Sequence, residues 1–200
     1  MAEPADLEEA IVDEILDRGY ANATVAGVCR RAAVGREEFQ SRFEDLEDGY
    51  CQVLERLRDE IIERLLAAFL TGSTWRERIR AVACAMFDFI EEDRRRARFM
   101  YIEVFAAGER AQTIREGGTA AMVELIDQGR QELEHPDRLS RATAEAIAGS
   151  VFRQIRAAIE RDDPRANDLM PQLMYSVVLP YLGAEEALRE LEIPPPQPLP

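Results

Sequence analysis

The chain contains no lysine, one histidine and three cysteines, and it has no long uninterrupted apolar segment. All 25 basic residues are therefore arginines, and 39 acidic residues leave a formal net charge of −14 at pH 7. This charge argues against a protein that binds nucleic acid non-specifically over its whole surface. No apolar run approaches the roughly 20 residues that a membrane-spanning helix needs, so we expect no membrane partner.

The first ten residues, MAEPADLEEA, are acidic and lack both the basic start and the apolar stretch of a signal peptide. We therefore expect the protein to stay in the cytoplasm. Cys29, Cys51 and Cys84 are odd in number, lack CxxC spacing and fall on apolar positions of expected helices. We interpret them as small core residues.

Helical periodicity covers nearly the whole chain, and no segment shows the sustained alternation of a β-strand. We therefore expect an all-α fold. The expected helices span about 6–18, 25–32, 36–43, 46–70, 75–93, 112–134, 139–161 and 167–182, with a short piece at 184–191.

Several sequence features indicate where these helices begin and end. Gly19 is expected to stop the first helix, and Thr24 to cap the second. Pro171 fits the first turn of the last long helix, and Pro180 is expected to interrupt its end. The run RRRAR at 94–98 is interpreted as a solvated basic turn, with contact to the acidic first helix as the functional alternative. The tail 194–200 is expected to be a frayed, polyproline-like end.

Residues 11–51 hold the most informative pattern. Val25, Val28 and Ala32 form one apolar stripe, Val34 precedes a tight turn at Gly35, and Phe39 and Phe43 form a second stripe. Two short helices with facing apolar stripes make a helix-turn-helix, whose second helix can expose a polar face to a DNA major groove. Four arginines against two glutamates give residues 24–43 a net charge of +2.

The stretch GYANATVAGVCRRAAVGREEFQSRFEDLED, followed by a long helix, resembles the TetR family of bacterial transcriptional regulators. The resemblance rests on about 45 residues, and the remainder agrees in helix number, order and length. It implies an N-terminal DNA-binding head, a larger C-terminal helical domain that binds a small-molecule effector, and a homodimer. We expect the head at 1–50, the larger domain at 51–193 and a Pro-rich tail at 194–200.

The chain departs from the family pattern at several positions. An acidic residue usually stands at the position of Gly27, where it completes a capping box with Thr24. Gly35 stands where the family usually has a serine before the reading helix. Gln40 stands where the family usually has a phosphate-binding tyrosine. A phosphate-binding lysine is replaced by Leu46, so that contact is expected to be missing.

We expect the DNA contacts to come from the two short helices and the turn between them. Arg36 is the first candidate for a guanine edge or a phosphate, Gln40 for adenine or a phosphate, and Arg42 for a phosphate. The expected DNA-binding set is Thr24, Gly35, Arg36, Glu37, Glu38, Gln40, Ser41 and Arg42. For Glu37 and Glu38 the alternative is stabilisation of the helix N-terminus by their negative charge.

The larger domain is expected to hold an apolar or amphipathic effector between its helices. The candidate lining residues are aromatic or methionine: Phe87, Phe99, Met100, Tyr101, Phe105, Met122 and Phe152. Apolar stripes near the end of the chain are expected to form a symmetric homodimer interface. Its candidate residues are Ile147, Val151, Ile155, Leu173, Val177 and Tyr181.

We expect neither an enzyme nor a bound cofactor or metal. His135 is the one histidine, and its Glu132-x-x-His135 spacing is a single copy where a di-iron carboxylate site needs two. No glycine-rich phosphate loop occurs. The sequence therefore predicts a dimeric, ligand-responsive repressor of a palindromic operator. The alternative is a similar dimer that has lost DNA binding and acts as a protein-interaction module, because Glu37, Glu38 and Leu46 disfavour DNA.

Overall fold

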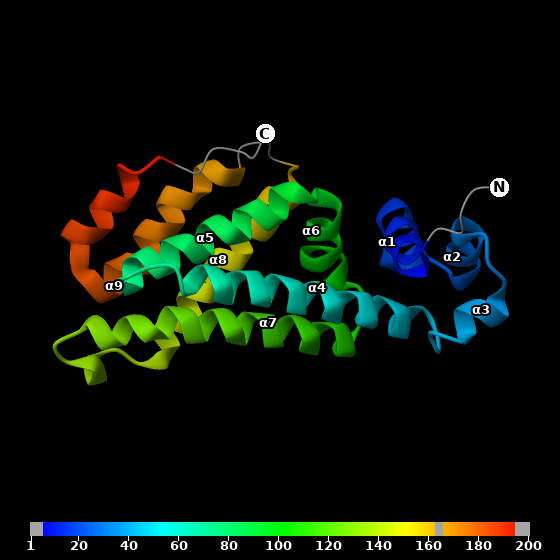
Figure 1. Ribbon diagram of the computed structural model, residues 1–200, viewed down its shortest axis with the longest axis horizontal. Coiled ribbons are helices and arrows are strands. Elements are labelled where there is room, and N and C mark those ends of the chain that lie inside the picture. Colours follow the sequence, from blue (N-terminus) through cyan, green and yellow to red (C-terminus); the bar gives the residue numbers. More distant parts are fainter. Residues whose placement is uncertain (1–5, 163–165, 195–200) are drawn as a thin grey trace. The chain divides into compact units, whose positions relative to one another are not determined.

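The computed structural model describes residues 6–162 and 166–194, and within these ranges it contains helices and no strand. The all-α expectation is confirmed. The α-helices are α1 (Leu7–Arg18), α2 (Val25–Ala32), α3 (Arg36–Gln40), α4 (Leu46–Phe69), α5 (Trp75–Glu92), α6 (Arg94–Tyr101), α7 (Glu109–Asp127), α8 (Arg141–Glu160) and α9 (Met170–Leu191) (Figure 1). Short 3-10 helices occur at η1 (Tyr20–Asn22), η2 (Glu103–Phe105), η3 (Gln128–Glu132), η4 (Pro136–Arg138) and η5 (Ala166–Leu169).

Contacts divide the chain into two compact units. The first contains the chain up to Asp59 together with Arg94–Glu116, and the second contains Glu60–Asp93 together with the chain from Gly117 onward. Helices α4 and α7 thus each contribute one part to both units. The expected division into functional domains at residue 50 stays a prediction.

The start of the first unit follows local rules of helix capping. The Asp6 side chain accepts a hydrogen bond from the backbone N–H of Glu8, 3.2 Å away, and so caps α1. The helix ends at Gly19, whose φ of 73° is a conformation that glycine adopts without strain. Ile11 and Ile15 are fully buried on the inner face of α1.

The three cysteines carry no disulfide. Cys29 and Cys51 are buried in the first unit, as the interpretation of core residues requires. Cys84 is half-buried in the second unit.

The expectation of a basic turn at 94–98 is wrong, because these residues form the first part of α6. The break in the chain is confined to Asp93, the C-cap of α5, whose backbone is non-helical (φ −147°, ψ 88°). Arginine is a good helix former, so a run of arginines does not end a helix. Arg95 forms an ion pair with Asp13 of α1, which is the alternative that the sequence left open.

The helix expected at 112–134 begins earlier and ends earlier. It starts at Glu109, gives way after Asp127 to η3, and does not reach His135. Gly129 lies in η3, and a Cβ there would lie 2.6 Å from Cζ2 of Trp75. The chain therefore passes close to the indole ring, which donates a hydrogen bond to the Leu125 carbonyl.

Helix α9 also differs from expectation at its end. Pro171 does lie in the first turn, but the helix continues past Pro180 and breaks at Gly183. The backbone there has φ 81° and ψ 178°, a conformation that strains residues with a side chain. The short piece expected at 184–191 follows this break. The expected polyproline-like tail lies largely outside the described residues.

Most of the predicted homodimer residues are buried within the chain itself. Ile155, Leu173, Val177 and Tyr181 are each at most 5% exposed. The Tyr181 ring packs edge-on against Trp75, with ring centroids 4.8 Å apart. These four residues pack between helices of one chain, and their assignment to the interface stays a prediction. Ile147 and Val151 are half-buried, and their assignment stays a prediction.

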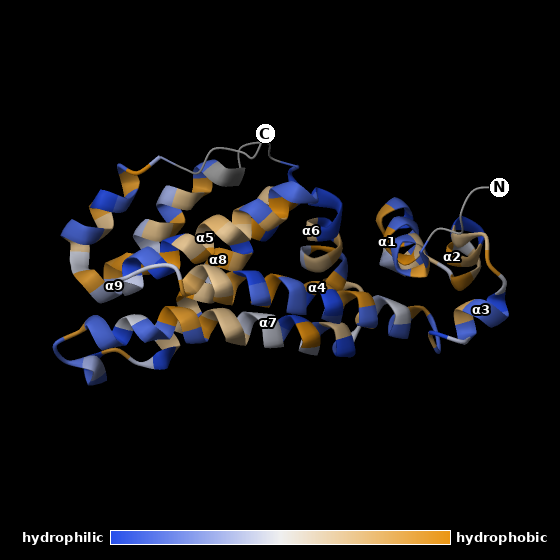
Figure 2. Cartoon of the chain, viewed as in Figure 1, coloured by the Kyte–Doolittle hydropathy of each residue, from blue (hydrophilic) through white to orange (hydrophobic). Residues whose placement is uncertain are grey.

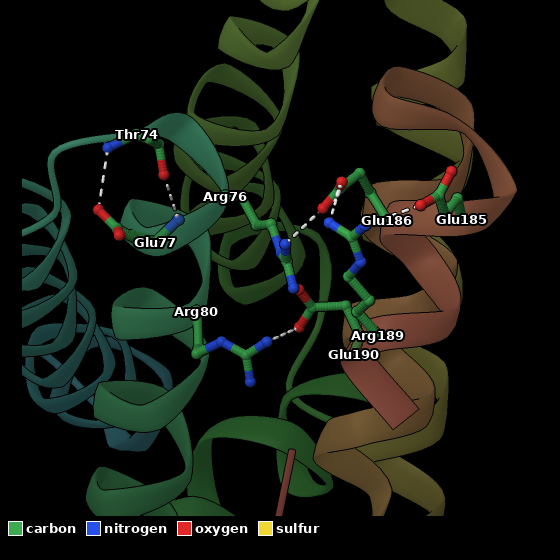
Figure 3. Close-up of polar contacts among 8 residues, drawn as sticks. All are labelled: Thr74, Arg76, Glu77, Arg80, Glu185, Glu186, Arg189 and Glu190. Atoms are coloured by element: carbon green, nitrogen blue, oxygen red, sulfur yellow. Dashed lines mark hydrogen bonds and ion pairs between the residues drawn. The ribbon is translucent and has the colours of Figure 1, made fainter. Parts of the chain in front are cut away.

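A cluster of charged side chains joins the end of α9 to α5 (Figure 3). Glu190 is fully buried and pairs with both Arg76 and Arg80. Arg76 also pairs with Glu186 at 2.6 Å. The side chains of Arg76, Arg80 and Glu186 are only 20–32% exposed. The capping box of Thr74 and Glu77 fixes the first turn of α5, from which Arg76 projects.

Each long helix carries both hydrophilic and hydrophobic residues along its length (Figure 2). In the described part of the chain, no helix combines the length and the apolar character that spanning a membrane would require.

We predict that Glu190→Ala lowers the free energy of unfolding by about 3 kcal/mol, because it leaves two poorly exposed guanidinium groups without their shared partner. Glu185→Ala removes the same charge from the same helix, but this side chain is 84% exposed. We expect that control to change stability by no more than about 0.5 kcal/mol. Urea unfolding followed by circular dichroism measures both. Equal losses in the two variants would contradict the structural role of Glu190.

Candidate DNA-binding surface

Helices α2 and α3 form the helix-turn-helix that the sequence predicts. Val28, Ala32 and Phe39 are fully buried, and Phe43 is 4% exposed. The rings of Phe39 and Phe43 lie 5.3 Å apart. Because these apolar residues face inward, the remaining residues of the short second helix are left on the outside.

The turn between the two helices is built differently from expectation. The residue in the left-handed conformation is Ala33 (φ 57°, ψ 35°), while Gly35 is extended. The Val34 N–H donates to the Cys29 carbonyl at 3.0 Å and closes the end of α2. A left-handed alanine costs about 1 kcal/mol or more, so packing of the two helices must impose it.

Helix α3 ends at Gln40, earlier than the predicted 43. The Ser41 hydroxyl donates to the Glu38 carbonyl at 2.7 Å. Phe43 therefore reaches the core from a turn. The hydroxyl of Ser41 is already used within the chain.

The predicted contact residues are all on the surface. The exposed members are Thr24, Gly35, Arg36, Glu37, Glu38, Gln40, Ser41 and Arg42. Thr24 caps α2 as expected, since its Oγ1 accepts a hydrogen bond from the Gly27 N–H at 3.0 Å. Their roles toward DNA remain predictions.

The arginines of this region fall into two groups. Arg31 is held by Glu14 and Asp17 at 2.8 and 2.7 Å, and Arg42 lies 4.0 Å from the Asp6 carboxylate. Arg30 and Arg36 are exposed and have no ion-pair partner within the described residues. Sequence reasoning counted Arg30 in the local charge but did not place it among the contacts.

The reading helix and the turn after it are acidic overall. Arg36 and Arg42 stand against four carboxylates from Glu37 to Asp45, which gives +2 − 4 = −2. Part of this acid has a structural task, because the Asp45 carboxylate accepts the N–H of Asp48 at the start of α4. The Asp45 carboxylate is therefore already engaged in a hydrogen bond within the chain.

Asp48 shows how the start of α4 is fixed. Burial acts to raise the pKa of its carboxyl, but hydrogen bonds from the Glu44 N–H (3.1 Å) and from Arg110 (3.0 Å) outweigh it and lower the pKa. The carboxylate therefore stays charged and links the beginning of α4 to α7.

Tyr50 connects α4 with α6 inside the first unit. Its hydroxyl donates to the Phe99 carbonyl at 2.8 Å, and its ring lies 4.4 Å from that of Phe99 and 5.2 Å from that of Tyr20. The Glu103 carboxylate accepts the Tyr20 N–H at 3.0 Å. Burial raises the pKa of Tyr20 to about 12.

The predicted effector-pocket residues divide between the two units. Phe99 and Met100 are buried in the first unit, Tyr101 is half-buried, and Phe105 is 42% exposed beneath the Arg115 guanidinium. Phe87 and Met122 are buried in the second unit, where Phe152 is half-buried. Phe99 packs against Tyr50, which is the role of a core residue; the pocket assignment of the set stays a prediction.

Among the described residues, no three histidine, cysteine or acidic side chains lie in a group that would hold a metal ion. His135 is exposed at the start of η4.

No model of a known protein family matches the chain. The transcriptional activator FasR of Mycolicibacterium smegmatis is 32% identical over 92 residues, which make up 46% of this chain and 42% of that protein. The chain therefore matches less than half the length of this curated relative.

Solved structures of regulators share the fold. FadR from Bacillus subtilis, in complex with stearoyl-CoA, has a TM-score of 0.73 at 19% identity, covering 88% of this chain and 97% of that one. FadR from Bacillus halodurans, a fatty acid degradation regulator, has a TM-score of 0.76 at 15% identity, covering 86% and 92%. A TetR family regulator from Marinobacter aquaeolei has a TM-score of 0.65 at 18% identity, covering 90% and 92%. All of these proteins are named as regulators, in agreement with the expectation that the chain is not an enzyme.

We predict that Thr24→Ala lowers the free energy of unfolding by about 1 kcal/mol, because the Gly27 N–H loses its acceptor. Thr24→Ser keeps the hydroxyl and should unfold close to the wild type. Urea unfolding of the three proteins measures the difference. An alanine variant as stable as the serine variant would show that the cap contributes nothing.

Proposed function

We propose that this chain, which has the fold of the TetR-family transcription regulators, binds double-stranded DNA through α2, the following turn and α3. The observation that carries the proposal is α3 itself. Buried Phe39 holds it in place, while Arg36 is exposed and unpaired within the described residues. The 32% identity to a segment of a named transcriptional activator supports the same conclusion.

Arg36 is the proposed base-reading residue, because a guanidinium can pair with two acceptors on a guanine edge. Gln40 is proposed to meet adenine or a phosphate. Arg42 and Thr24, with the exposed backbone at Gly35, are proposed to meet phosphates, and these contacts fix position more than sequence. Glu37 and Glu38 restrict binding to sites where a carboxylate finds a donor, such as a cytosine amino group.

We predict that Arg36→Ala weakens binding to the DNA upstream of the chain's own gene by roughly ten- to hundredfold, the cost of a lost base contact. A gel shift at low salt measures the change. Arg138→Ala removes the same charge from an exposed position in η4 and serves as the control. Equal affinities of the two variants would remove Arg36 from the binding surface.

A homodimer is proposed as the active form, because a palindromic operator requires two reading helices related by symmetry. The exposed side of α8 and α9 is the proposed interface. It offers small residues at Ala146 and Gly149 and the 36% exposed Leu179, with half-buried Ile147 and Val151 at its margin. Small side chains allow two helices to approach closely, and a Cβ at Gly149 would meet no atom within 4 Å.

We further propose an amphipathic effector of the long-chain acyl-CoA class. The B. subtilis FadR structure, which shares the fold, contains stearoyl-CoA, and the second unit offers an apolar interior lined by Phe87, Met122 and other large side chains. The effector is proposed to release a repressor from DNA. A ligand shifts this equilibrium only by its preference between the two conformations.

We predict that stearoyl-CoA lowers the affinity of the chain for its upstream DNA by roughly tenfold, within the usual range of coupling between two sites. Fluorescence anisotropy of a labelled DNA fragment measures the effect. Coenzyme A without an acyl chain is the control and should leave the affinity unchanged. An equal affinity with and without stearoyl-CoA would reject this effector class, and a higher affinity would reject release from DNA as the mode of control.

A protein-interaction module is the second candidate function. The net charge of −2 on α3 and the turn after it favours this alternative, since carboxylates close to phosphates reduce affinity. Absence of any gel shift at low salt, with wild type and Arg36→Ala alike, would support it.

A further inference from the structure

The first turn of α2 contains no acidic residue, although Thr24 caps it in the usual way. In a capping box the third helical position carries an acid that complements such a cap. In α2 this position is Gly27, which is buried. The first turn therefore lacks a negative charge of its own at the end of the helix that favours one.

Glu14 of α1 occupies the space that a side chain of Gly27 would take. A Cβ added at Gly27 would overlap Oε1 and Cδ of Glu14 and would lie 2.7 Å from its Oε2. Glu14 is 1% exposed, so its carboxylate is enclosed between the two helices. Only glycine at position 27 permits this approach.

Glu14 also forms the ion pair that an acidic residue at position 27 would be placed to form. Its Oε2 accepts from Nε of Arg31 at 2.8 Å, and its Oε1 lies 3.1 Å from Nε of Arg18. Arg31 stands four residues after Gly27, where a helical acid at position 27 would meet it as an i, i+4 pair. Asp17 holds the other side of the Arg31 guanidinium at 2.7 Å.

We propose that Glu14 serves as the first-turn acid of α2 and is thereby the positioning residue that seats the helix-turn-helix on α1. Gly27 has no side chain, and Glu14 of α1 places its carboxylate in the space that such a side chain would fill. Because Glu14 of α1 pairs with Arg31 of α2, it fixes α2 against α1. The effect on DNA rests on the proposed function, because α2 carries the turn that presents α3.

A reciprocal exchange tests this role. Glu14→Ala should lower the urea midpoint, and Gly27→Glu alone should lower it further, because two carboxylates then compete for one place. The double variant Glu14→Ala/Gly27→Glu should have a higher midpoint than either single variant, since the new acid can bond the cap and face Arg31. DNA affinity should fall about tenfold in Glu14→Ala, equivalent to about 1.4 kcal/mol, and recover in the double variant.

Glu9→Ala is the matched control, because it removes an exposed carboxylate from the same helix and should leave the midpoint unchanged. Glu14→Gln keeps the shape without the charge and replaces Glu14→Ala if that variant does not fold. The proposal is overturned if Gly27→Glu is as stable as the wild type, or if the double variant is no more stable than Glu14→Ala. The midpoints alone decide the seating role. A wild type that binds no DNA would refute the proposed function without affecting this comparison.

Discussion

The burial of Phe39 is the interaction on which the proposed reading surface depends. Helix α3 has only five residues, and a helix of that length is not stable in water by itself. Phe39 is fully enclosed, and Phe43 reaches the same core from the following turn. The helix therefore exists because one aromatic side chain is anchored, and its outward residues are free of any packing task. Because the outward side chains of α3 do not pack in the core, their identity can be determined by the ligand that the helix binds.

Most arginines of the first unit pair with acidic residues of the same unit. Arg31, Arg56 and Arg110 each pair with an acid of the first unit at 2.7–3.0 Å. Few arginines remain unpaired and could bind a phosphate or a base, among them Arg30 and Arg36. An acidic protein of this kind gains little from general attraction to DNA. The proposed DNA binding therefore depends on a few directed contacts.

Local sequence rules predicted the helices of the first unit well, because caps and glycine stops act within a few residues. Thr24, Gly19 and the spacing of Val28, Ala32 and Phe39 are examples. The same reasoning missed α6, because charge was taken as a sign of a turn although arginine favours helices. Such rules do not show that residues 94–116 belong to the first unit, since that depends on distant contacts such as Tyr50 with Phe99.

Periodicity is ambiguous in a related way at the predicted homodimer residues. Periodicity identifies the apolar face of a helix, but it does not show whether the same chain or a second copy covers that face. Tyr181 is covered by Trp75, and the break at Gly183 then returns the chain toward α5, where Glu190 meets Arg76 and Arg80. The role of Gly27 was equally hidden, because its explanation lies in Glu14, thirteen positions earlier on another helix.

The use of arginine in every ion pair has a consequence for alkaline conditions. Carboxylate partners raise the already high pKa of guanidinium groups such as Arg31 and Arg110, so these pairs keep their charge in base. Two neutral acids, the buried Cys51 and the half-buried Tyr20, behave differently. Burial raises the pKa of the Cys51 thiol from 9.0 to about 11, and that of the Tyr20 phenol from 10.0 to about 12. The unfolded chain ionises these groups first, so their contribution is complete below about pH 9 and is lost as the pH rises through 11 and 12. The neutral forms of Cys51 and Tyr20 therefore favour the folded chain only up to this pH range, whereas the ion pairs keep their charge through it.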